Sequence, residues 1–322
     1  MARSVRRAGL PQELVTDLLG AGCTTCEDAL HLRVLDMMKV SAKLTCTGAA
    51  SALGTVAAAV CPPVVSAADL LHKYKSQPHS VRTPLPMLDA VLGDGFAFGS
   101  LTELAGTSGA GKSQWCMSTA LSVLLAPGHE ATEVVYIETE GKLSPQLLER
   151  MAMARLAADG VADAGAAAAS ALRRLHILTA TDAPAFLGVL STLEGMVLQS
   201  DVALVVVDSI AGAVKADEGH VARQEALMAA ATALKTLAEH FSFAVLVTNL
   251  AHTRAGGELS PSLGVAWSHA VNTRLLLDTT GSTREVVVAK CPSAPRVRLP
   301  FAITRAGVMM PTEATSRGFA AS

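Results

Sequence analysis

The sequence predicts an α/β protein with a mainly parallel twisted sheet, preceded by a small all-helical N-terminal domain. Three observations lead to this prediction: a glycine-rich motif at residues 106–113, strand-like and helix-like segments that alternate around it, and a helical pattern before residue 60. Such alternation favours a parallel sheet with helices on both faces. We expect a helical domain at residues 1–60, a linker at 61–83 and the sheet domain at 84–322.

Composition sets the first limits on function. Half of the residues are hydrophobic but only 3% are aromatic, so we expect a core built from Ala, Leu and Val. The net charge of -2 gives no general attraction to nucleic acid, so any DNA contact has to be local or supplied by a partner. Cys23 and Cys26 form a C-x-x-C pair, but a zinc site needs a second pair at suitable spacing, and the sequence has none.

The first 60 residues have the pattern of four short helices. We expect these helices at residues 11–19, 26–30, 31–40 and 49–60. Pro11 suits the first position of a helix, because it has no N–H group to leave unpaired. Thr24 or Thr25 suits the cap of the second helix, and Thr47 suits the cap of the fourth.

The stretch from residue 44 to residue 68 carries no charged side chain, which raises the question of a membrane span. Two glycines and the Pro62-Pro63 pair interrupt it, and it is rich in Ala, Ser and Thr. It therefore lacks the sustained apolarity of a spanning helix, and we expect a buried helix followed by a linker, with no membrane partner. Within the linker, the prolines favour extended chain, and Val64-Val65 could add a strand to a sheet edge.

The sheet domain is expected to open with a short helix at residues 84–92. Further strands are predicted at residues 100–104, 133–138, 176–178, 202–207 and 244–248, and helices at 114–125, 147–156, 184–199 and 222–240, with 157–170 as a partly helical surface stretch. The run at 202–207 is apolar throughout, which is typical of a strand buried on both faces. Residues 274–279 and 285–289 flank Gly281-Ser282 and predict an antiparallel hairpin near the end.

The motif at residues 106–113 fits the phosphate-binding P-loop, G-x-x-x-x-G-K-[ST]. Its glycines let backbone N–H groups converge on one point, and the helix that follows adds the positive end of its dipole. In this motif Lys112 reaches the β- and γ-phosphates, and Ser113 coordinates Mg²⁺. A chance match is disfavoured because a strand precedes the loop and a helix follows it. We predict that ATP is bound with Mg²⁺ by Gly106, Thr107, Ser108, Gly109, Ala110, Gly111, Lys112 and Ser113.

Two acidic residues that follow predicted strands complete a candidate hydrolytic site. Asp208 ends the buried strand at 202–207, where a carboxylate can hold the Mg²⁺ shell; the plainer alternative is an Asp that only caps a turn. Glu140 follows the strand at 133–138, where a carboxylate can orient and deprotonate the attacking water; the alternative is a solvated loop acid. Glu138 is the weaker candidate for the base, because it still lies in the strand pattern.

With these landmarks in place, the chain resembles the eukaryotic RecA-like strand-exchange recombinases and their paralogs. The similarity extends over about residues 10–311 and rests mainly on residues 98–113, 136–141, 205–209 and 247–249. Among the paralogs it looks most like the B-type, on residues 10–14, 38–40, 267–275 and 289–295, of which the last two are the most specific. The resemblance implies a RecA-like P-loop ATPase core, and it puts the catalytic glutamate at Glu140.

The resemblance also implies a function. It implies an ATP-binding, DNA-stimulated ATPase in the nucleus that takes part in homologous-recombination repair of DNA double-strand breaks. Paralogs of this kind assemble with other recombinase paralogs, the C-type partner first, and act on single-stranded or branched DNA. In the family, ATP sits at a subunit boundary, so a neighbouring subunit could complete the site.

Several positions depart from the family pattern. The glutamine that couples the γ-phosphate to a DNA-binding loop is replaced by Leu250, and the Phe-x-x-Ala docking motif appears as residues 65–68 with a smaller first residue. The two predicted DNA loops, residues 215–222 and 251–263, are sparse in positive charge, and their candidate contacts are Lys215, His252 and Arg254. We therefore do not expect this chain to form filaments or exchange strands alone.

Three functions remain open from the sequence. The first is an ATP-hydrolysing recombination mediator that works inside a paralog complex, with Lys112 and Glu140 as its catalytic residues. The second is a structural adaptor that uses ATP to hold an interface together, which Leu250 and the sparse loops favour. The third is an unrelated RecA-like ATPase, against which the helical N-terminal domain argues.

Overall fold

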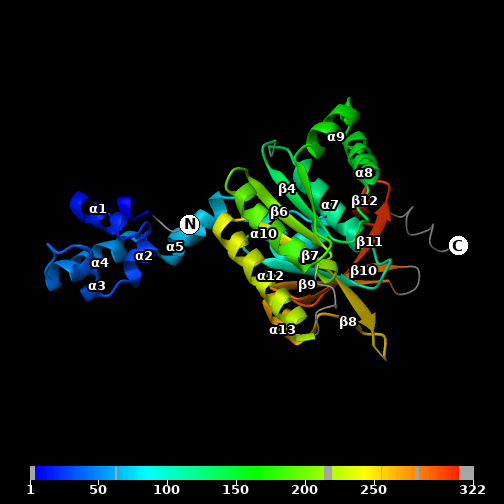
Figure 1. Ribbon diagram of the computed structural model, residues 1–322. Helices are drawn as coiled ribbons and strands as arrows, with labels where there is room; N and C mark the ends of the chain where they lie inside the picture. Colours follow the sequence, from blue (N-terminus) through cyan, green and yellow to red (C-terminus); the bar gives the residue numbers. More distant parts are fainter. Residues whose placement is uncertain are drawn as a thin grey trace. The chain divides into compact units, whose positions relative to one another are not determined.

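The computed structural model describes residues 4–61, 64–128, 130–213, 220–254, 256–279 and 283–311 (Figure 1). Lys215 and the turn at Gly281-Ser282 lie outside these described residues. The chain divides into two compact units, Met1–Gln77 and Pro78–Ser322. Within the described residues, no helix is both long and apolar enough to cross a membrane.

The first unit is helical, as the sequence predicts. Its elements are a short 3-10 helix η1 (Val5–Arg7), α1 (Gln12–Gly20), α2 (Cys26–His31), α3 (Val34–Val40), α4 (Cys46–Val60) and α5 (Ala67–Ser76). η1 and α1 to α4 enclose a small core that includes Leu18, Met37 and Val56, which are fully buried, whereas α5 contributes no buried residue. Cys23 and Cys26 are buried as free thiols in the same cluster.

The helix starts confirm one predicted cap, correct another, and move Pro11 from the predicted first helical position to the cap. Thr25 and Asp28 form a capping box at α2: each side chain accepts a hydrogen bond from the backbone N–H of the other residue. α4 is capped by Thr45, whose Oγ1 accepts from the N–H of Gly48 at 3.1 Å, so the prediction of Thr47 is wrong. Thr47 already lies within the helix. Pro11 occupies the cap of α1 and not its first helical position.

The segment predicted as a linker contains a helix that the sequence analysis missed. α5 begins after Ser66, whose Oγ accepts from the N–H of Asp69 at 3.1 Å, while the carboxylate of Asp69 accepts from the N–H of Ser66 at 3.3 Å. This reciprocal pair is a capping box. Val64 and Val65 are exposed and belong to no strand of this chain.

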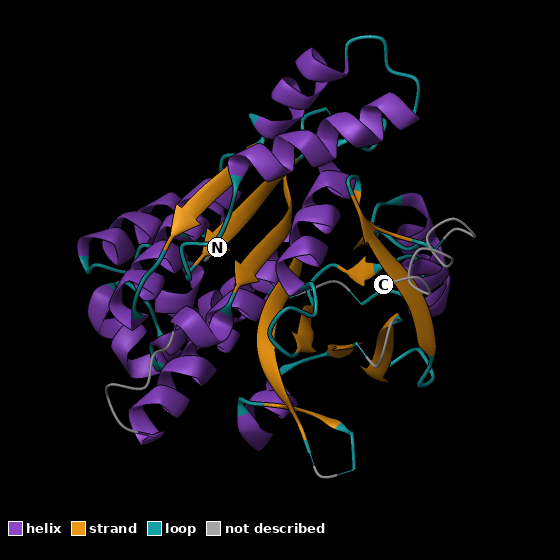
Figure 2. Ribbon diagram, turned by 90° about the vertical axis from the view of Figure 1, so that its right-hand side faces the viewer, coloured by secondary structure: helices purple, strands orange, loops and turns teal. Residues whose placement is uncertain are grey.

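The second unit is built on a twisted sheet with helices on both sides, shown in Figure 2, which confirms the predicted fold class. Within the described residues the sheet has ten strands, in the order β12-β11-β10-β9-β3-β7-β6-β4-β5, with β8 paired to β7. The parallel strands are β9 (Thr273–Asp278), β3 (Leu101–Gly106), β7 (Ala244–Thr253), β6 (Val202–Asp208), β4 (Glu133–Glu138) and β5 (Leu175–Thr179).

The antiparallel part lies at one end of the sheet. It consists of β10 (Arg284–Lys290), β11 (Arg298–Thr304) and β12 (Gly307–Met309). β9 and β10 are the predicted hairpin strands, whereas β11 and β12 were not predicted. The short strand β8 (Leu259–Pro261), the helix α13 (Gly264–Ala270) and the separate ribbon of β1 (Ser80–Val81) with β2 (Phe96–Ala97) were also not predicted.

The central strands are buried on both faces, and successive residues point to opposite cores. Along β6, for example, Leu204 and Val206 belong to one core, and Val205 and Val207 to the other. The first core is covered by α7 (Lys112–Leu124), α8 (Pro145–Ala158) and α9 (Ala164–Leu172), and the second by α10 (Ala183–Val197) and α12 (His220–Phe241). The remaining helices of this unit are α6 (Pro86–Leu92) and the single turn α11 (Ile210–Ala213).

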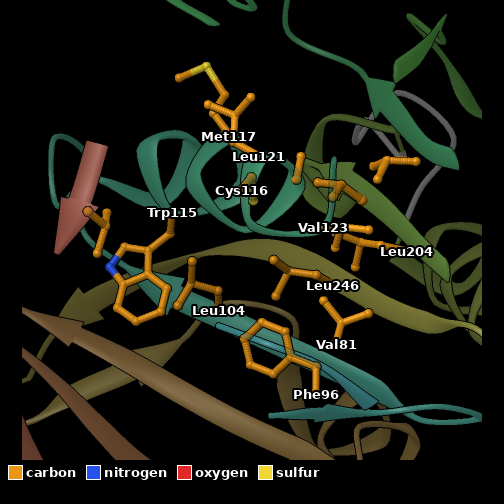
Figure 3. Packing of buried hydrophobic residues seen from close by; sticks show 14 of the residues in the cluster. Val81, Phe96, Leu104, Trp115, Cys116, Met117, Leu121, Val123, Leu204 and Leu246 are labelled. Atoms are coloured by element: carbon orange, nitrogen blue, oxygen red, sulfur yellow. The ribbon is translucent and has the colours of Figure 1, made fainter. Parts of the chain in front are cut away.

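Helix α7 is the element that fixes the phosphate-loop motif to the sheet. Trp115 and Cys116 are fully buried on its inner face, and Figure 3 shows the Trp115 ring beside Leu104 of β3 and Cys116 above Leu246 of β7. Trp115 also packs edge-on against Phe301 of β11, with 5.5 Å between ring centroids. The strand before the motif and the helix after it are therefore held by one core.

Candidate nucleotide site

The strands that carry the predicted site residues end at one edge of the sheet. Gly106 of β3 is paired with Leu250 of β7, and Glu138 of β4 is paired with Asp208 of β6. Because these strands are parallel, their carboxyl ends and the loops that follow them lie together. The arrangement brings the motif of residues 106–113 near the predicted carboxylates.

The motif itself has the conformation that its glycines predict. Gly109 and Gly111 have positive φ values of 78° and 102°, which residues with a side chain rarely adopt. At Gly106, an added Cβ would lie 3.1 Å from the Cβ atoms of Ala110 and Leu277, so the close approach leaves little room for a side chain. Gly111 caps the N-terminus of α7, where the helix dipole favours an anion.

A cavity of about 720 Å³ opens at this edge of the sheet. Its lining includes Lys112, Ser113, Glu140 and Asp208, which are the four residues predicted to carry the chemistry. The other lining residues are Ser108, Gly109, Gly111, Gln114, Lys142, Ser209, Ala211, Gly212, Leu250 and Ile303. The structure thus gathers residues from three separate parts of the sequence, the 106–113 motif, Glu140 and Asp208, into one pocket.

Lys112 is folded back onto its own loop. Its Nζ donates to the carbonyl oxygens of Gly106 and Thr107, both at 2.9 Å. Burial lowers the pKa of Lys112, and the nearby carboxylates of Asp208 and Glu140 oppose that shift. The ammonium group is held at the cavity by two neutral acceptors, which an anionic phosphate would outcompete.

Asp208 is held by two hydroxyl donors. The Tyr136 hydroxyl donates to its Oδ2 at 2.8 Å, and the Thr248 hydroxyl donates to its Oδ1 at 2.6 Å. Each carboxylate oxygen has two lone pairs, so both keep acceptor capacity toward the cavity. Together with the hydroxyl of Ser113 they form an oxygen donor set, which fits Mg²⁺. The surroundings also raise the pKa of Tyr136, mainly through burial, so it remains a hydroxyl donor.

Glu138 organises the loop that follows β4. Its Oε1 accepts from the backbone N–H of Glu140 at 3.0 Å and from that of Lys142 at 2.8 Å. The side chain of Glu138 is buried and does not line the cavity. This geometry favours Glu140 over Glu138 as the acid that faces a ligand.

Glu140 has a partner on each carboxylate oxygen. Ser209 Oγ donates to its Oε1 at 2.7 Å, and Lys142 Nζ lies 2.6 Å from its Oε2. These contacts, with that of Lys142 the larger, lower the pKa of Glu140. The same pairing raises the pKa of Lys142. Both groups are therefore charged at neutral pH.

A buried polar cluster outside the cavity lining ties four elements together. Glu103 of β3 is fully buried and accepts from Asn249 Nδ2 of β7 at 2.7 Å and from Trp267 Nε1 of α13 at 2.8 Å. Its other oxygen pairs with Arg274 of β9. Arg274 also donates to Ser268 Oγ at 3.0 Å. A buried charge is stable only when it is paired in this way.

The predicted DNA contacts lie away from the cavity lining. Beyond Leu250, β7 continues to Thr253 and pairs with β8, so the second predicted DNA loop is largely a β-hairpin. His252 and Arg254 are exposed on this hairpin. Neither lines the cavity, whereas Leu250 does. Lys215 lies outside the described residues.

The sequence analysis missed several residues of the site, namely Tyr136, Lys142, Ser209 and Thr248. Lys142, two positions after Glu140, has no motif of its own to identify it. Thr248 and Ser209 lie at or after the carboxyl ends of predicted strands, and that placement alone was a usable signal. In the described part of the chain, no group of three or more His, Cys, Asp or Glu side chains is placed to hold a metal ion.

Comparison with known proteins places the whole arrangement in a family. The sequence profile of the Rad51 family matches residues 75–311. The chain is 30% identical over 345 aligned residues to human DNA repair protein RAD51 homolog 2, with 96% of this chain and 89% of that protein covered. It is 37% identical over 243 residues to bovine DNA repair protein RAD51 homolog 4, with 71% and 72% covered.

The recombinases themselves are also similar. The DNA repair protein RAD51 of Saccharomyces cerevisiae is 30% identical over 319 residues, with 95% of this chain and 77% of that protein covered. These matches confirm the resemblance to the RecA-like recombinases and their paralogs that the sequence motifs indicated. The chain belongs to the Rad51 family.

Proposed function

We propose that this chain binds ATP and hydrolyses it inside a complex of recombinase paralogs, as a mediator of homologous-recombination repair of DNA double-strand breaks. The observation that carries the proposal is the single cavity lined by Lys112, Ser113, Glu140 and Asp208. The relatives named as DNA repair proteins support the place of this chemistry in repair.

The binding step uses the loop of residues 106–113. Its backbone N–H groups and the N-terminus of α7 surround the phosphates, and Lys112 exchanges its two carbonyl partners for phosphate oxygens. Ser113 and Asp208 would hold Mg²⁺, which neutralises charge on the phosphates when it is bound.

The hydrolytic step is in-line attack of water on the γ-phosphate, which breaks the bond from the γ-phosphorus to the β–γ bridging oxygen and releases ADP and inorganic phosphate. Glu140 orients this water and accepts its proton, and Lys112 stabilises the negative charge on the phosphate oxygens. Tyr136 and Thr248 act as positioning residues, because their hydroxyl groups fix the orientation of the Asp208 carboxylate.

The proposed partners follow from the family. They are other recombinase paralogs, the C-type first, together with single-stranded or branched DNA, in the nucleus. His252 and Arg254 are the proposed DNA contacts within the described residues, with Lys215 as a third outside them. So few positive side chains make a strong DNA site on this chain alone unfavourable, so partners supply most of the DNA contact.

The test is ATP hydrolysis by the purified full chain in complex with its C-type paralog, with and without single-stranded DNA. Turnover is expected to rise with partner and DNA and to vanish when Glu140→Gln is placed in this chain. An unchanged rate in that variant would locate hydrolysis in the partner and contradict the proposed enzyme.

A second function, a non-hydrolysing adaptor that uses ATP to hold an interface, is favoured by Leu250. This apolar side chain is 38% exposed and lines the cavity, where it cannot hydrogen-bond a phosphate. Lys112→Ala separates the two functions. Complex assembly that survives while repair is lost supports the mediator, and assembly that is lost supports the adaptor.

A further inference from the structure

A lysine that no motif predicts faces the same cavity as the phosphate-loop lysine. Lys142 lies in the loop between β4 and α8, and its side chain lines the cavity together with Lys112. Its backbone is fixed, because its N–H donates to the buried carboxylate of Glu138 at 2.8 Å. Its side chain is 73% exposed, so the long aliphatic stem is free to reorient around that fixed point.

The Lys142 ammonium group forms an ion pair with Glu140, the carboxylate that the hydrolytic step needs. Nζ lies 2.6 Å from Glu140 Oε2, while Ser209 Oγ takes Oε1 at 2.7 Å. A carboxylate with a cation on one oxygen and a hydroxyl on the other is a weaker proton acceptor and offers fewer lone pairs to a water. In this arrangement Glu140 is held in a resting state.

A bound triphosphate would compete with Glu140 for the Lys142 ammonium group. An exposed lysine–glutamate pair is a weak interaction, since water screens it. A terminal phosphate bound in the cavity offers several negative charges and strong acceptor oxygens to the same ammonium group. The transfer of Lys142 from Glu140 to the phosphate is therefore favourable, and a diphosphate, which ends one phosphate earlier, would not drive it.

Resting on the proposed ATP site, we propose that Lys142 is a second phosphate-binding lysine: it leaves Glu140 for the terminal phosphate of ATP and so releases the base. The presence of the γ-phosphate is then sensed from the loop after β4. This assignment suits a site in which β7, two strands away from β4 in the sheet, presents the apolar Leu250 to the cavity.

The experiment measures equilibrium affinity and not turnover. Binding of a non-hydrolysable ATP analogue and of ADP, each with Mg²⁺, is compared for the full-length wild type, Lys142→Ala, Glu140→Gln and the double variant. Lys142→Ala is expected to lower the affinity for the analogue about tenfold, which corresponds to loss of one charge-assisted contact. The affinity for ADP is expected to change by less than about twofold. Glu140→Gln is expected to raise the affinity for the analogue a few-fold, and this gain in affinity is expected to be smaller in the double variant.

Two further variants act as controls. Lys142→Arg keeps the positive charge and is expected to keep the preference for the analogue over ADP. Lys43→Ala removes a matched exposed lysine, which pairs with Glu13 at 3.0 Å in the N-terminal unit, and is expected to change neither affinity. Thermal unfolding of each variant checks that the fold is retained, and Lys142→Met serves if Lys142→Ala is unstable.

The outcomes separate this inference from the function on which it rests. An analogue affinity unchanged by Lys142→Ala, or analogue and ADP weakened equally, overturns the role of Lys142 while the ATP site stands. A Glu140→Gln gain of the same size with and without Lys142 also overturns it. A wild type that binds neither nucleotide contradicts the proposed ATP site and the role of Lys142 together.

Discussion

β3 and β7 run side by side in parallel, but they contribute different chemistry to the edge of the cavity. Gly106, the last residue of β3, is paired with Leu250 of β7. β3 continues into a loop suited to phosphates, whereas β7 presents an apolar side chain to the same cavity and then continues into the hairpin with β8. The two neighbouring strands thus present different chemistry to one cavity: a loop suited to phosphates after β3 and an apolar side chain on β7.

The two strands nevertheless share one buried anchor. Glu103 of β3 accepts from Asn249, the residue directly before Leu250, and pairs with Arg274 of β9. One residue upstream, Thr248 contacts Asp208. Polar contacts thus hold β7 up to residue 249. The next residue, Leu250, is the first on β7 that presents an apolar side chain to the cavity.

The largest expected effect comes from the hydrolytic carboxylate. Glu140→Gln removes the proton acceptor but leaves the phosphate loop intact, so turnover in the paralog complex is expected to fall about 10²- to 10⁴-fold. Binding of a non-hydrolysable ATP analogue is expected to persist. Steady-state hydrolysis and analogue titration measure the two properties, and Glu149→Gln on the exposed side of α8 is the matched control. Loss of both properties in Glu140→Gln would contradict the division of roles.

The shared anchor predicts a large effect on stability. Glu103→Ala strands the guanidinium of Arg274, whose side chain is 13% exposed, and leaves the Asn249 and Trp267 donors unpaired. The free energy of unfolding is expected to fall by about 3–5 kcal/mol, as measured by urea denaturation. Glu285→Ala removes the exposed contact with Arg298 and is expected to cost less than about 1 kcal/mol. Equal losses in the two variants would show that the cluster is not the anchor.

Lys112→Ala tests the β3 side of the comparison. Lys112 contacts two backbone carbonyls, and its replacement removes the positive charge from the phosphates. ATP affinity is expected to fall about 10- to 100-fold, which corresponds to loss of a hydrogen bond from a charged group. Calorimetric titration measures the affinity, and an unchanged unfolding temperature excludes a folding defect. Unaltered affinity would contradict the proposal that the loop of residues 106–113 binds the phosphates of ATP.

Leu250→Gln tests the β7 side and has the smallest expected effect. A glutamine at this position can hydrogen-bond a phosphate while it remains part of the strand that leads to the hairpin. In the paralog complex, stimulation of turnover by single-stranded DNA is expected to increase roughly 2- to 10-fold, the range of one modest hydrogen bond. Leu250→Met changes shape but adds no donor, and it is expected to behave as the wild type. Equal stimulation in all three proteins would show that coupling does not run through residue 250.

The sequence predicted best those features that depend on short local patterns. The apolar run at residues 202–207 is strand β6, and within the phosphate loop Gly109 and Gly111 adopt positive φ values. Thr25 caps α2 through a local contact with Asp28. In each case, the residues that decide the structure are neighbours in the sequence.

The features that were missed depend on distant contacts or on competing local signals. β11 contains Pro300 and is paired with β10 and β12, so its strand is fixed by partners that no local pattern shows. At α5, the capping box of Ser66 and Asp69 was present in the sequence, but the two prolines before it directed the interpretation toward extended chain. The pairing of Lys142 with Glu140 needs the turn that Glu138 organises, which only the structure shows.

The central claim is that this chain holds and hydrolyses ATP without passing the signal along β7 by itself. The most direct measurement is ATP turnover by the purified full chain without any partner, with and without single-stranded DNA. We predict that the lone chain binds ATP and turns it over slowly at a rate that DNA does not change. Stimulation of this turnover by DNA is expected only when a second paralog is added. Strong stimulation of the lone chain by DNA would contradict the claim, because it would show that β7, with Leu250 at the cavity, transmits the signal unaided.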